Sequence, residues 1–220
     1  MEKEDKILII MPMYNAESFI RESISSIINQ KNIKLVIVDD CSTDNSYQIA
    51  KSFPRVTVIR NRKNKGTYYS INIGLYNMRL DDSWTHYCIH GADDISLPNR
   101  FKSQLSLFSD KYVAVSCIST RKNYYSNQII RVNKTATESQ MIFKREVFDS
   151  IGYYDHSTRV GGDTEYKCRF LLKYSGRTAL INESLVIGYQ HGSNLTQTVK
   201  IGGRIRRNYV SKFRANHLKI

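Results

Sequence analysis

The sequence lacks three features that would place it in familiar classes of protein. No apolar run approaches the roughly 20 residues that cross a bilayer, so we expect no transmembrane segment. The charged start MEKEDK does not have the pattern of a signal peptide. The 11 glycines form neither a GxGxxG motif nor a P-loop, which weakens a dinucleotide-binding or NTPase hypothesis.

Cysteine is scarce as well, and its spacing excludes the usual zinc and redox motifs. The four cysteines are far apart and form no CxxC pair. Three of them lie in apolar or helical contexts, which is typical of reduced, partly buried thiols. We therefore expect a cytoplasmic protein without disulfides; the residues concerned are Cys41, Cys88, Cys117 and Cys168.

Acidic residues are few, with 20 against 33 basic residues and a net charge of +13. The deficit is greatest in residues 200–220, which hold Lys and Arg but no Asp or Glu. Such a tail can contact an acidic surface, a phosphorylated ligand or nucleic acid, or form a solvated helix face. We keep contact with an acidic surface as the interaction hypothesis and expect no nucleic-acid partner.

Apolar runs and helical patterns alternate along the first half of the chain. The strands are continuously apolar, which is typical of a mostly parallel α/β sheet with helices on both faces. The predicted strands are 6–11, 33–40, 55–60, 84–89 and 112–118, and the predicted helices are 15–30, 42–53, 64–78 and 97–108.

The pattern changes after residue ~120 to that of a smaller mixed lobe. We predict a hairpin over 122–134, a strand leading into a helix over 139–152, a helix over 161–176 and strands over 177–181 and 184–191. No Pro- or Gly-rich linker and no repeat interrupts the chain. We therefore predict one domain, residues 1–220, made of a nucleotide-binding lobe (1–118), an acceptor-side lobe (119–198) and the basic tail (199–220).

Two pairs of acids, Asp39-Asp40 and Asp93-Asp94, follow predicted strands. The carboxyl ends of parallel strands meet at one edge of the sheet, so both pairs should face one crevice. Adjacent carboxylates repel each other unless a cation lies beside them. Mg²⁺ or Mn²⁺ takes one or two carboxylates from a protein and further oxygens from phosphate and water. Asp93 and Asp94 therefore suggest a metal–diphosphate site, the alternative being a cap for the helix near Pro98.

Several motifs occur together in a fixed order: IIMPMYNAESF, LVIVDDCSTDNS, NKGTYYSINIG, HGADDISLPNRF, and later GGDTEYKCRF and YQHGSNLT. This set resembles the family-2 inverting glycosyltransferases with the GT-A fold, with the closest resemblance to the spore-coat-polysaccharide type. The resemblance covers most of residues 6–198. The sequence departs from the family at Gly91, where many relatives carry an acid, and at Ile71, where they often carry a basic residue.

The resemblance implies a role for each matching residue. Asp163 matches the catalytic base, and the glycines before it would let the backbone approach a substrate. The other positions are Pro12 and Tyr14 beside the nucleobase, Asp40 as its hydrogen-bond partner, Lys65 and Asn72 closing over the nucleotide, Asp93 at the ribose or metal, Asp94 at the metal, and His191 near the diphosphate or metal.

Each of these residues also has a purely structural explanation. Asp163 could cap its helix and Asp40 could cap the turn that follows it. Lys65 could be a solvated loop charge, and His191 an ordinary histidine at a strand end. The residues alone leave these alternatives open.

The implied function is metal-dependent, inverting transfer of a sugar from a nucleotide-diphosphate donor to an acceptor hydroxyl. We expect a UDP-sugar donor, a glycan or other hydroxyl acceptor, and Mn²⁺ or Mg²⁺ as cofactor, in glycan or polysaccharide synthesis. A nucleotidyltransferase is disfavoured because MPMYNAES holds no glycine or lysine. The remaining alternative is a non-catalytic module that binds nucleotide sugar or nucleic acid.

Overall fold

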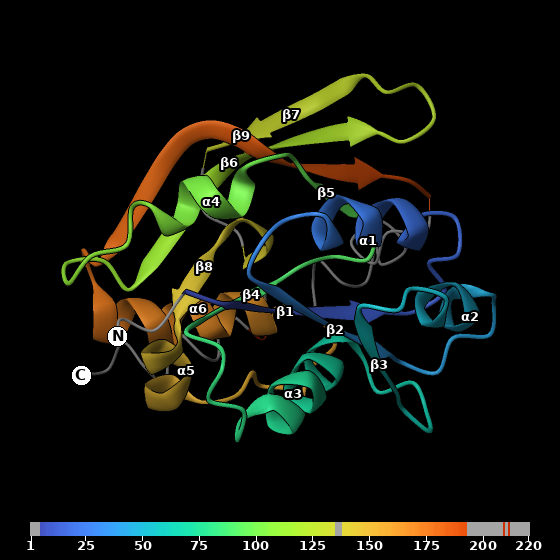
Figure 1. Cartoon of the computed structure of the whole chain (residues 1–220), viewed down its shortest axis with the longest axis horizontal. Coiled ribbons are helices and arrows are strands. Elements are labelled where there is room, and N and C mark those ends of the chain that lie inside the picture. The colour runs from blue at the N-terminus through green and yellow to red at the C-terminus, as the bar shows by residue number, and fades with distance from the viewer. Residues whose placement is uncertain (1–4, 135–137, 193–208, 210, 212–220) are drawn as a thin grey trace.

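A computed structural model describes residues 5–134, 138–192, 209 and 211. Within them, nine strands form one sheet in the order β3-β2-β1-β4-β8-β6-β9-β5, and β7 pairs with β6 (Figure 1). No helix in these ranges is long and apolar enough to cross a membrane. The strands are β1 (Ile7–Met13), β2 (Ile33–Asp39), β3 (Val56–Arg60), β4 (His86–Ile89), β5 (Asp94–Ser96), β6 (Ala114–Asn123), β7 (Ile129–Asn133), β8 (Ile142–Lys144) and β9 (Thr178–Gln190).

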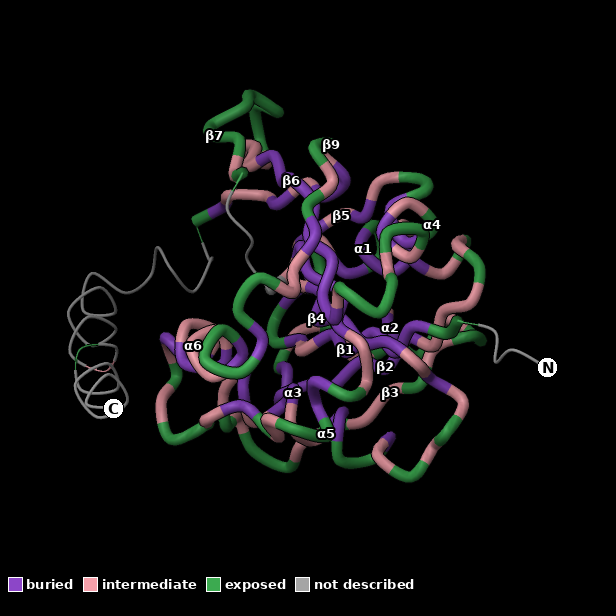
Figure 2. The backbone as a smooth tube through the Cα atoms, turned by 90° about the vertical axis from the view of Figure 1, so that its left-hand side faces the viewer, coloured by how far each residue is buried: buried purple, intermediate pink, exposed green. Residues whose placement is uncertain are grey.

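The helices cover both faces of this sheet, which confirms the predicted fold class. Successive residues of β1 point to opposite faces: Leu8 and Ile10 join the core under one group of helices, and Ile7 and Ile9 the core under the other. Figure 2 shows the buried strands β1, β2 and β4 between the two groups. One group is α3 (Thr67–Met78), α5 (Arg145–Ile151) and α6 (Gly162–Tyr174); the other is α1 (Ile20–Ile28), α2 (Ser46–Lys51) and α4 (Arg100–Leu105).

The first four strands of the chain pair in parallel, in the order β3-β2-β1-β4 with β3 at the edge of the sheet. Strand β8 then joins β4 and β6 by antiparallel pairing, so the two predicted lobes share one sheet. The predicted hairpin over 122–134 is present as the antiparallel pair β6–β7. The basic tail lies, except for Tyr209 and Ser211, outside the described residues.

The two strands predicted over 177–181 and 184–191 are one strand, β9, which runs parallel to β6. The register shifts where Cys117 pairs with Ile181 and Ile118 pairs with Ser184. A bulge of this kind accommodates the extra polar residues without ending the pairing. The polar interruption at 182–183 therefore marks a bulge and not a loop.

The acids Asp93 and Asp94 do not lie between a strand and a helix. Asp94 is the first residue of the short strand β5 and pairs with Gly188 of β9. Helix α4 begins later, with Asn99 at its N-cap position in the left-handed conformation (φ 65°) and no side-chain cap hydrogen bond. The capping alternative for the acid pair is therefore wrong. The pairing of β5 with β9 is remote in sequence, so the local pattern did not reveal it.

Two buried histidines lie on or next to β4. Burial lowers the pKa of His86 from 6.5 to about 4, despite the nearby Asp5, and lowers the pKa of His90 to about 3. The His86 side chain packs on Phe108, with ring centroids 4.3 Å apart. Both imidazoles are therefore neutral in the folded protein at neutral pH.

We expect the free energy of unfolding to fall as the pH is lowered from 7 to 5. An unfolded histidine takes up a proton below pH 6.5, whereas folded His86 does so only near pH 4. The loss for one such histidine is on the order of 2 kcal/mol. Urea denaturation at several pH values would measure it. His86→Gln should flatten this pH dependence, and the same slope in the variant and the wild type would contradict the assignment.

Candidate functional site

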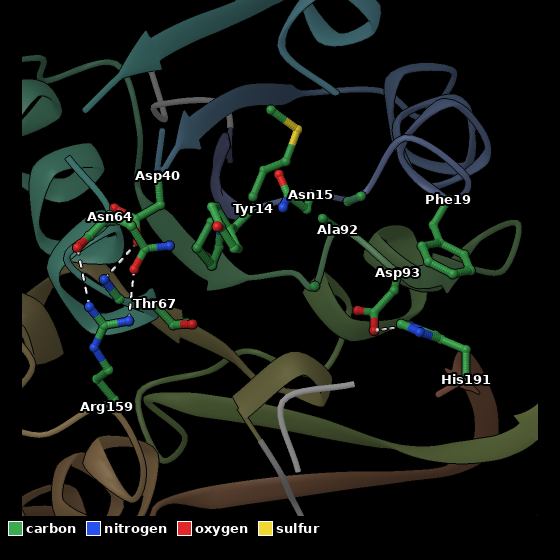
Figure 3. A pocket seen from close by; sticks show the side chains of 16 residues that line it. Tyr14, Asn15, Phe19, Asp40, Asn64, Thr67, Ala92, Asp93, Arg159 and His191 are labelled. Carbon is green, nitrogen blue, oxygen red and sulfur yellow. Dashed lines mark hydrogen bonds and ion pairs between the residues drawn. The ribbon is translucent and has the colours of Figure 1, made fainter. Parts of the chain in front are cut away.

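A pocket of about 480 Å³ lies at the carboxyl ends of β1, β2 and β4 (Figure 3). It is lined by Asp40 after β2 and by Asp93 after β4, so one acid from each pair faces the same crevice. The other described residues of the lining are Pro12, Met13, Tyr14, Asn15, Ala16, Phe19, Asn64, Gly66, Thr67, Ser70, Gly91, Ala92, Arg159 and His191.

Asp39, the other acid of the first pair, lies behind the pocket wall. Its side chain is fully buried and forms an ion pair with Nε of Arg60 at 3.1 Å. It also accepts the backbone N–H of Ser42 at 3.2 Å. Asp39 therefore stabilises the turn after β2.

Asp40 binds the loop that follows β3. Its carboxylate accepts the backbone N–H groups of Lys65 (3.0 Å) and Gly66 (2.6 Å) and the side-chain amide of Asn61 (2.9 Å). The Lys65 N–H is shared between both oxygens, at 3.0 and 3.1 Å. Each oxygen therefore already accepts two contacts, and a further donor would replace one arm of this shared bond. Asp40 thus shapes this wall of the pocket and faces its interior.

The first strand supplies the neighbouring wall. Pro12 lies within β1 and pairs in register with Val38, and Tyr14 follows the end of the strand. The Tyr14 side chain is 49% exposed in the pocket, so its ring is available to a flat ligand.

At the opposite end of the pocket lie Asp93 and His191, as Figure 3 shows. Oδ2 of Asp93 is 3.0 Å from Nε2 of His191. The imidazole stacks on Phe19, with ring centroids 4.1 Å apart and an angle of 25° between the planes. The ring of Phe19 therefore fixes the orientation of His191 toward Asp93.

Gly91 leaves a hollow in which the two acids converge. A Cβ atom at this position would lie 2.8 Å from Oδ2 of Asp94 and 2.9 Å from Oδ1 of Asp93. A side chain at position 91 would therefore displace one or both carboxylates. Because Gly91 has none, both carboxylates can approach its backbone.

Asp94 is the buried member of this pair. Burial and, secondly, the charge of Asp93 raise its pKa from 3.8 to about 7, and the charges of Arg121 and Arg100 oppose that rise. The Asp94 side chain is absent from the described pocket lining, unlike Asp93. The two acids thus differ in access to the pocket.

Asp93 and Asp94 fit a hard divalent cation as a pair of carboxylate ligands. Both carboxylates approach the hollow beside Gly91, and their mutual repulsion would be relieved by positive charge. Within the described ranges, no group of three or more acidic, His or Cys side chains is placed to hold a metal ion, and Nε2 of His191 contacts Asp93. Mg²⁺ and related ions commonly complete such a set with phosphate and water.

Lys65 and Asn72 lie outside the described lining of the pocket. Lys65 acts through its backbone N–H on Asp40, while its ammonium group lies 4.6 Å from the ring centroid of Tyr69. The amide of Asn72 donates to the carbonyl of Tyr154 at 2.8 Å and accepts the N–H of Tyr154 at 2.9 Å. In this structure Asn72 therefore holds the loop before α6.

Asp163 lies in the first turn of α6, after the N-cap residue Gly161. The N-cap residue of the helix is Gly161, so Asp163 is not the N-cap itself. As an acid in the first turn it can still interact favourably with the helix dipole. Its Oδ1 atom accepts a hydrogen bond from the hydroxyl of Tyr68 at 3.1 Å. Thr67, the neighbour of Tyr68 in sequence, lines the pocket, whereas Asp163 is absent from the described lining.

The sequence did not indicate Phe19 or Arg159 as site residues. Nη1 of Arg159 donates to Oδ1 of Asn64 at 2.7 Å, which joins the loop before α6 to the loop after β3. Arg159 and Asn64 are 95 positions apart, and Arg159 lies outside the motifs quoted above. Arg159 thereby contributes a guanidinium group to the pocket near Asp40 (Figure 3).

Residues 8–170, most of the chain, match the family described as glycosyl transferase family 2. The chain belongs to that family. Among curated relatives, an uncharacterized glycosyltransferase of Haemophilus influenzae is 27% identical over 92% of this chain and 76% of its own length. The minor teichoic acid biosynthesis protein GgaA of Bacillus subtilis is 34% identical over 46% of this chain and 24% of its own.

Several curated relatives are aligned over only part of their own length. The aligned segments span between 12% and 41% of the length of four curated relatives. The chain therefore matches less than half of each of these proteins.

Solved structures share the GT-A fold with this family member. Staphylococcus aureus TarS in complex with UDP-GlcNAc superposes with a TM-score of 0.80 at 15% identity, over 97% of this chain and 67% of that one. The mannosyltransferase PcManGT of Pyrobaculum calidifontis, in complex with GDP-Man and Mn²⁺, has a TM-score of 0.67 at 17% identity, over 98% and 64%.

Proposed function

We propose that this glycosyltransferase moves a sugar from a UDP-sugar to an acceptor hydroxyl, with inversion and with the help of Mn²⁺ or Mg²⁺. The observation that carries the proposal is the pocket with Asp40 at one end and Asp93 with His191 at the other. One end suits a nucleobase and the other a diphosphate. The acceptor is a glycan or another hydroxyl compound, and the product belongs to glycan or polysaccharide synthesis.

The nucleobase end is formed by Pro12, Tyr14 and Asp40. The imide N3–H of uracil can donate to Asp40 in place of one arm of the bond shared with Lys65, and Tyr14 can lie against the ring. Cytosine has no N3–H. Guanine has a ring N–H of its own, but on a larger bicyclic ring that places this donor differently. TarS was solved with UDP-GlcNAc and PcManGT with GDP-Man, so the preference for uridine is supported by Asp40 and not by the shared fold.

The diphosphate end is formed by Asp93, Asp94 and His191. A divalent cation bound there would supply positive charge to a diphosphate leaving group. Asp93 and His191 face the pocket, and Asp94 lies behind them across the hollow at Gly91. These residues would hold the cation at a fixed place, and the positive charge of the cation is opposite to that of the diphosphate.

The reaction forms a bond between the acceptor oxygen and the anomeric carbon while the bond to the diphosphate breaks. The acceptor hydroxyl must lose its proton as it attacks, and a carboxylate can accept that proton. We assign this task to Asp163. A single displacement on the face opposite the leaving group inverts the anomeric centre, so one base is sufficient.

We expect UDP to bind at least about tenfold more tightly than GDP or CDP in the presence of Mn²⁺. Cytosine lacks the N3–H, so a hydrogen bond to a charged group is lost, and the larger ring of guanine places its N–H away from the position that the uracil N3–H takes. Isothermal titration calorimetry with the three diphosphates measures this directly. Varying the ligand leaves the bonds between Asp40 and its loop intact, whereas a mutation of Asp40 would disturb them. TDP keeps the N3–H and serves as the matched control. A preference for GDP would contradict the proposal.

A further inference from the structure

Tyr68 connects the pocket wall to Asp163. Its hydroxyl donates to Oδ1 of Asp163 at 3.1 Å, across 95 positions of sequence. Tyr68 lies in the first turn of α3, immediately after Gly66 and Thr67, both of which line the pocket. One side chain therefore bridges the segment beside the donor pocket and the segment that carries the carboxylate.

The ring of Tyr68 is held in a parallel stack of three tyrosines. Its centroid lies 6.3 Å from that of Tyr154 at an angle of 7°, and Tyr154 lies 3.9 Å from Tyr166 at 8°. The hydroxyl of Tyr166 is in turn 2.5 Å from that of Tyr87 in β4. Asn72 binds both backbone polar groups of Tyr154, the middle member. These contacts fix the position of the Tyr68 hydroxyl.

Gly162 makes room for this arrangement. A Cβ atom on Gly162 would lie 2.8 Å from Cδ2 of Tyr68 and 2.9 Å from the carbonyl oxygen of Asp155. The close approach at the glycine before Asp163 is therefore to Tyr68 and its own loop, where the sequence suggested a substrate. The side chain missing at Gly162 is what allows the ring to reach the carboxylate.

We propose that Tyr68 is a positioning residue for Asp163. The inference rests on the proposed role of Asp163 as the base. A hydrogen bond to Oδ1 fixes the plane of the carboxylate and hence the direction in which its other oxygen points. A base that is misplaced by a fraction of an ångström loses much of its effect, because proton transfer requires a near-attack geometry.

Tyr68→Phe tests the inference, because it keeps the ring and the stack and removes the hydroxyl that donates to Asp163. We expect the single-turnover rate of sugar transfer at saturating donor to fall about tenfold. The affinity for UDP should change by less than about twofold, because the residues that line the pocket are untouched. An unchanged rate in Tyr68→Phe would overturn the inference.

Tyr174→Phe is the matched control. Tyr174 is 8% exposed, close to the 9% of Tyr68, and its hydroxyl is 2.7 Å from Oγ of Ser150. It lies at the far end of α6 from Asp163. The control should lose similar stability, measured as melting temperature, and keep the rate of the wild type. An equal loss of rate in both variants would assign a structural role to Tyr68 and overturn the inference.

A double-mutant cycle separates this inference from the proposed function. If Tyr68 acts only through Asp163, adding Tyr68→Phe to Asp163→Asn should cause no further loss of rate. Independent, multiplicative losses would overturn the positioning role. A full rate in Asp163→Asn would refute the base itself, whereas a low rate there with a silent Tyr68→Phe would refute only the inference.

Discussion

Asp163→Asn should lower sugar transfer by roughly 10²–10⁴-fold, the usual contribution of general acid–base catalysis. The amide cannot accept the proton of the acceptor hydroxyl, but it keeps the size of the side chain and can still accept from Tyr68. Affinity for the donor should survive, because Asp163 lies outside the described lining of the pocket. Single-turnover transfer at saturating donor and Mn²⁺, together with calorimetry of UDP binding, measures both quantities.

The stability of this variant provides a separate measurement. Replacing an acid in the first turn of a helix by an amide removes a favourable interaction with the helix dipole of about 0.3–1 kcal/mol, so a small decrease in melting temperature is expected. Asp149→Asn is the matched control, since Asp149 is an exposed acid of α5 that forms an ion pair with Arg145 at 3.8 Å. That control should retain full activity.

Near-normal transfer by Asp163→Asn would refute the assignment of the base. Two other acids near Asp163 in sequence already form ion pairs or hydrogen bonds within the protein. Glu165 is buried and forms an ion pair with Arg169 at 2.5 Å, and Asp155 accepts hydrogen bonds from Ser157 and Tyr209. These interactions make each a weaker candidate than Asp163, but they would be the next to test.

Asp93→Asn should abolish the dependence of UDP binding on metal. A ligand amide lacks the negative charge that a hard cation requires, so affinity for UDP in Mn²⁺ should fall by about 100-fold or more. Affinity in the presence of a chelator should be unchanged, because the nucleobase end of the pocket is not altered. Calorimetric titrations with Mn²⁺ and with EDTA give the two values for wild type and variant.

Comparison with two further variants makes this test specific. Asp82→Asn removes an acid whose side chain is 86% exposed and should have no effect. Asp94→Asn should weaken metal-dependent binding less than Asp93→Asn, because Asp94 is buried and its charge is opposed by Arg121 and Arg100. Undiminished dependence on Mn²⁺ in Asp93→Asn would show that Asp93 does not bind the metal.

The alternating apolar and helical patterns were enough to predict the fold class and most of the elements. Leu8 and Ile10 face one core and Ile7 and Ile9 the other, and a run that is buried on both faces is visible in the sequence as a continuous apolar segment. The rule that ligands bind at the carboxyl ends of parallel strands also placed Asp40 and Asp93 in one pocket.

Local patterns did not reveal contacts that join distant segments. Strand β5 exists because β9 supplies the partner of Asp94 at Gly188, and this pairing decides that Asp94 is buried while Asp93 faces the pocket. In the same way, Asn72 holds Tyr154 instead of facing the pocket, and Arg159 reaches Asn64.

The sequence by itself determined an α/β fold with acids at strand ends, because the burial of each strand follows from its local hydrophobicity. The order of its motifs indicated the glycosyltransferase family. Only the tertiary structure decided which acid of each pair is accessible and which side chains support Asp163. The bond from Tyr68 and the space left by Gly162 depend on the packing of α3 against α6. Packing of this kind is set by the shapes of residues far apart in the chain, which no short stretch of sequence contains.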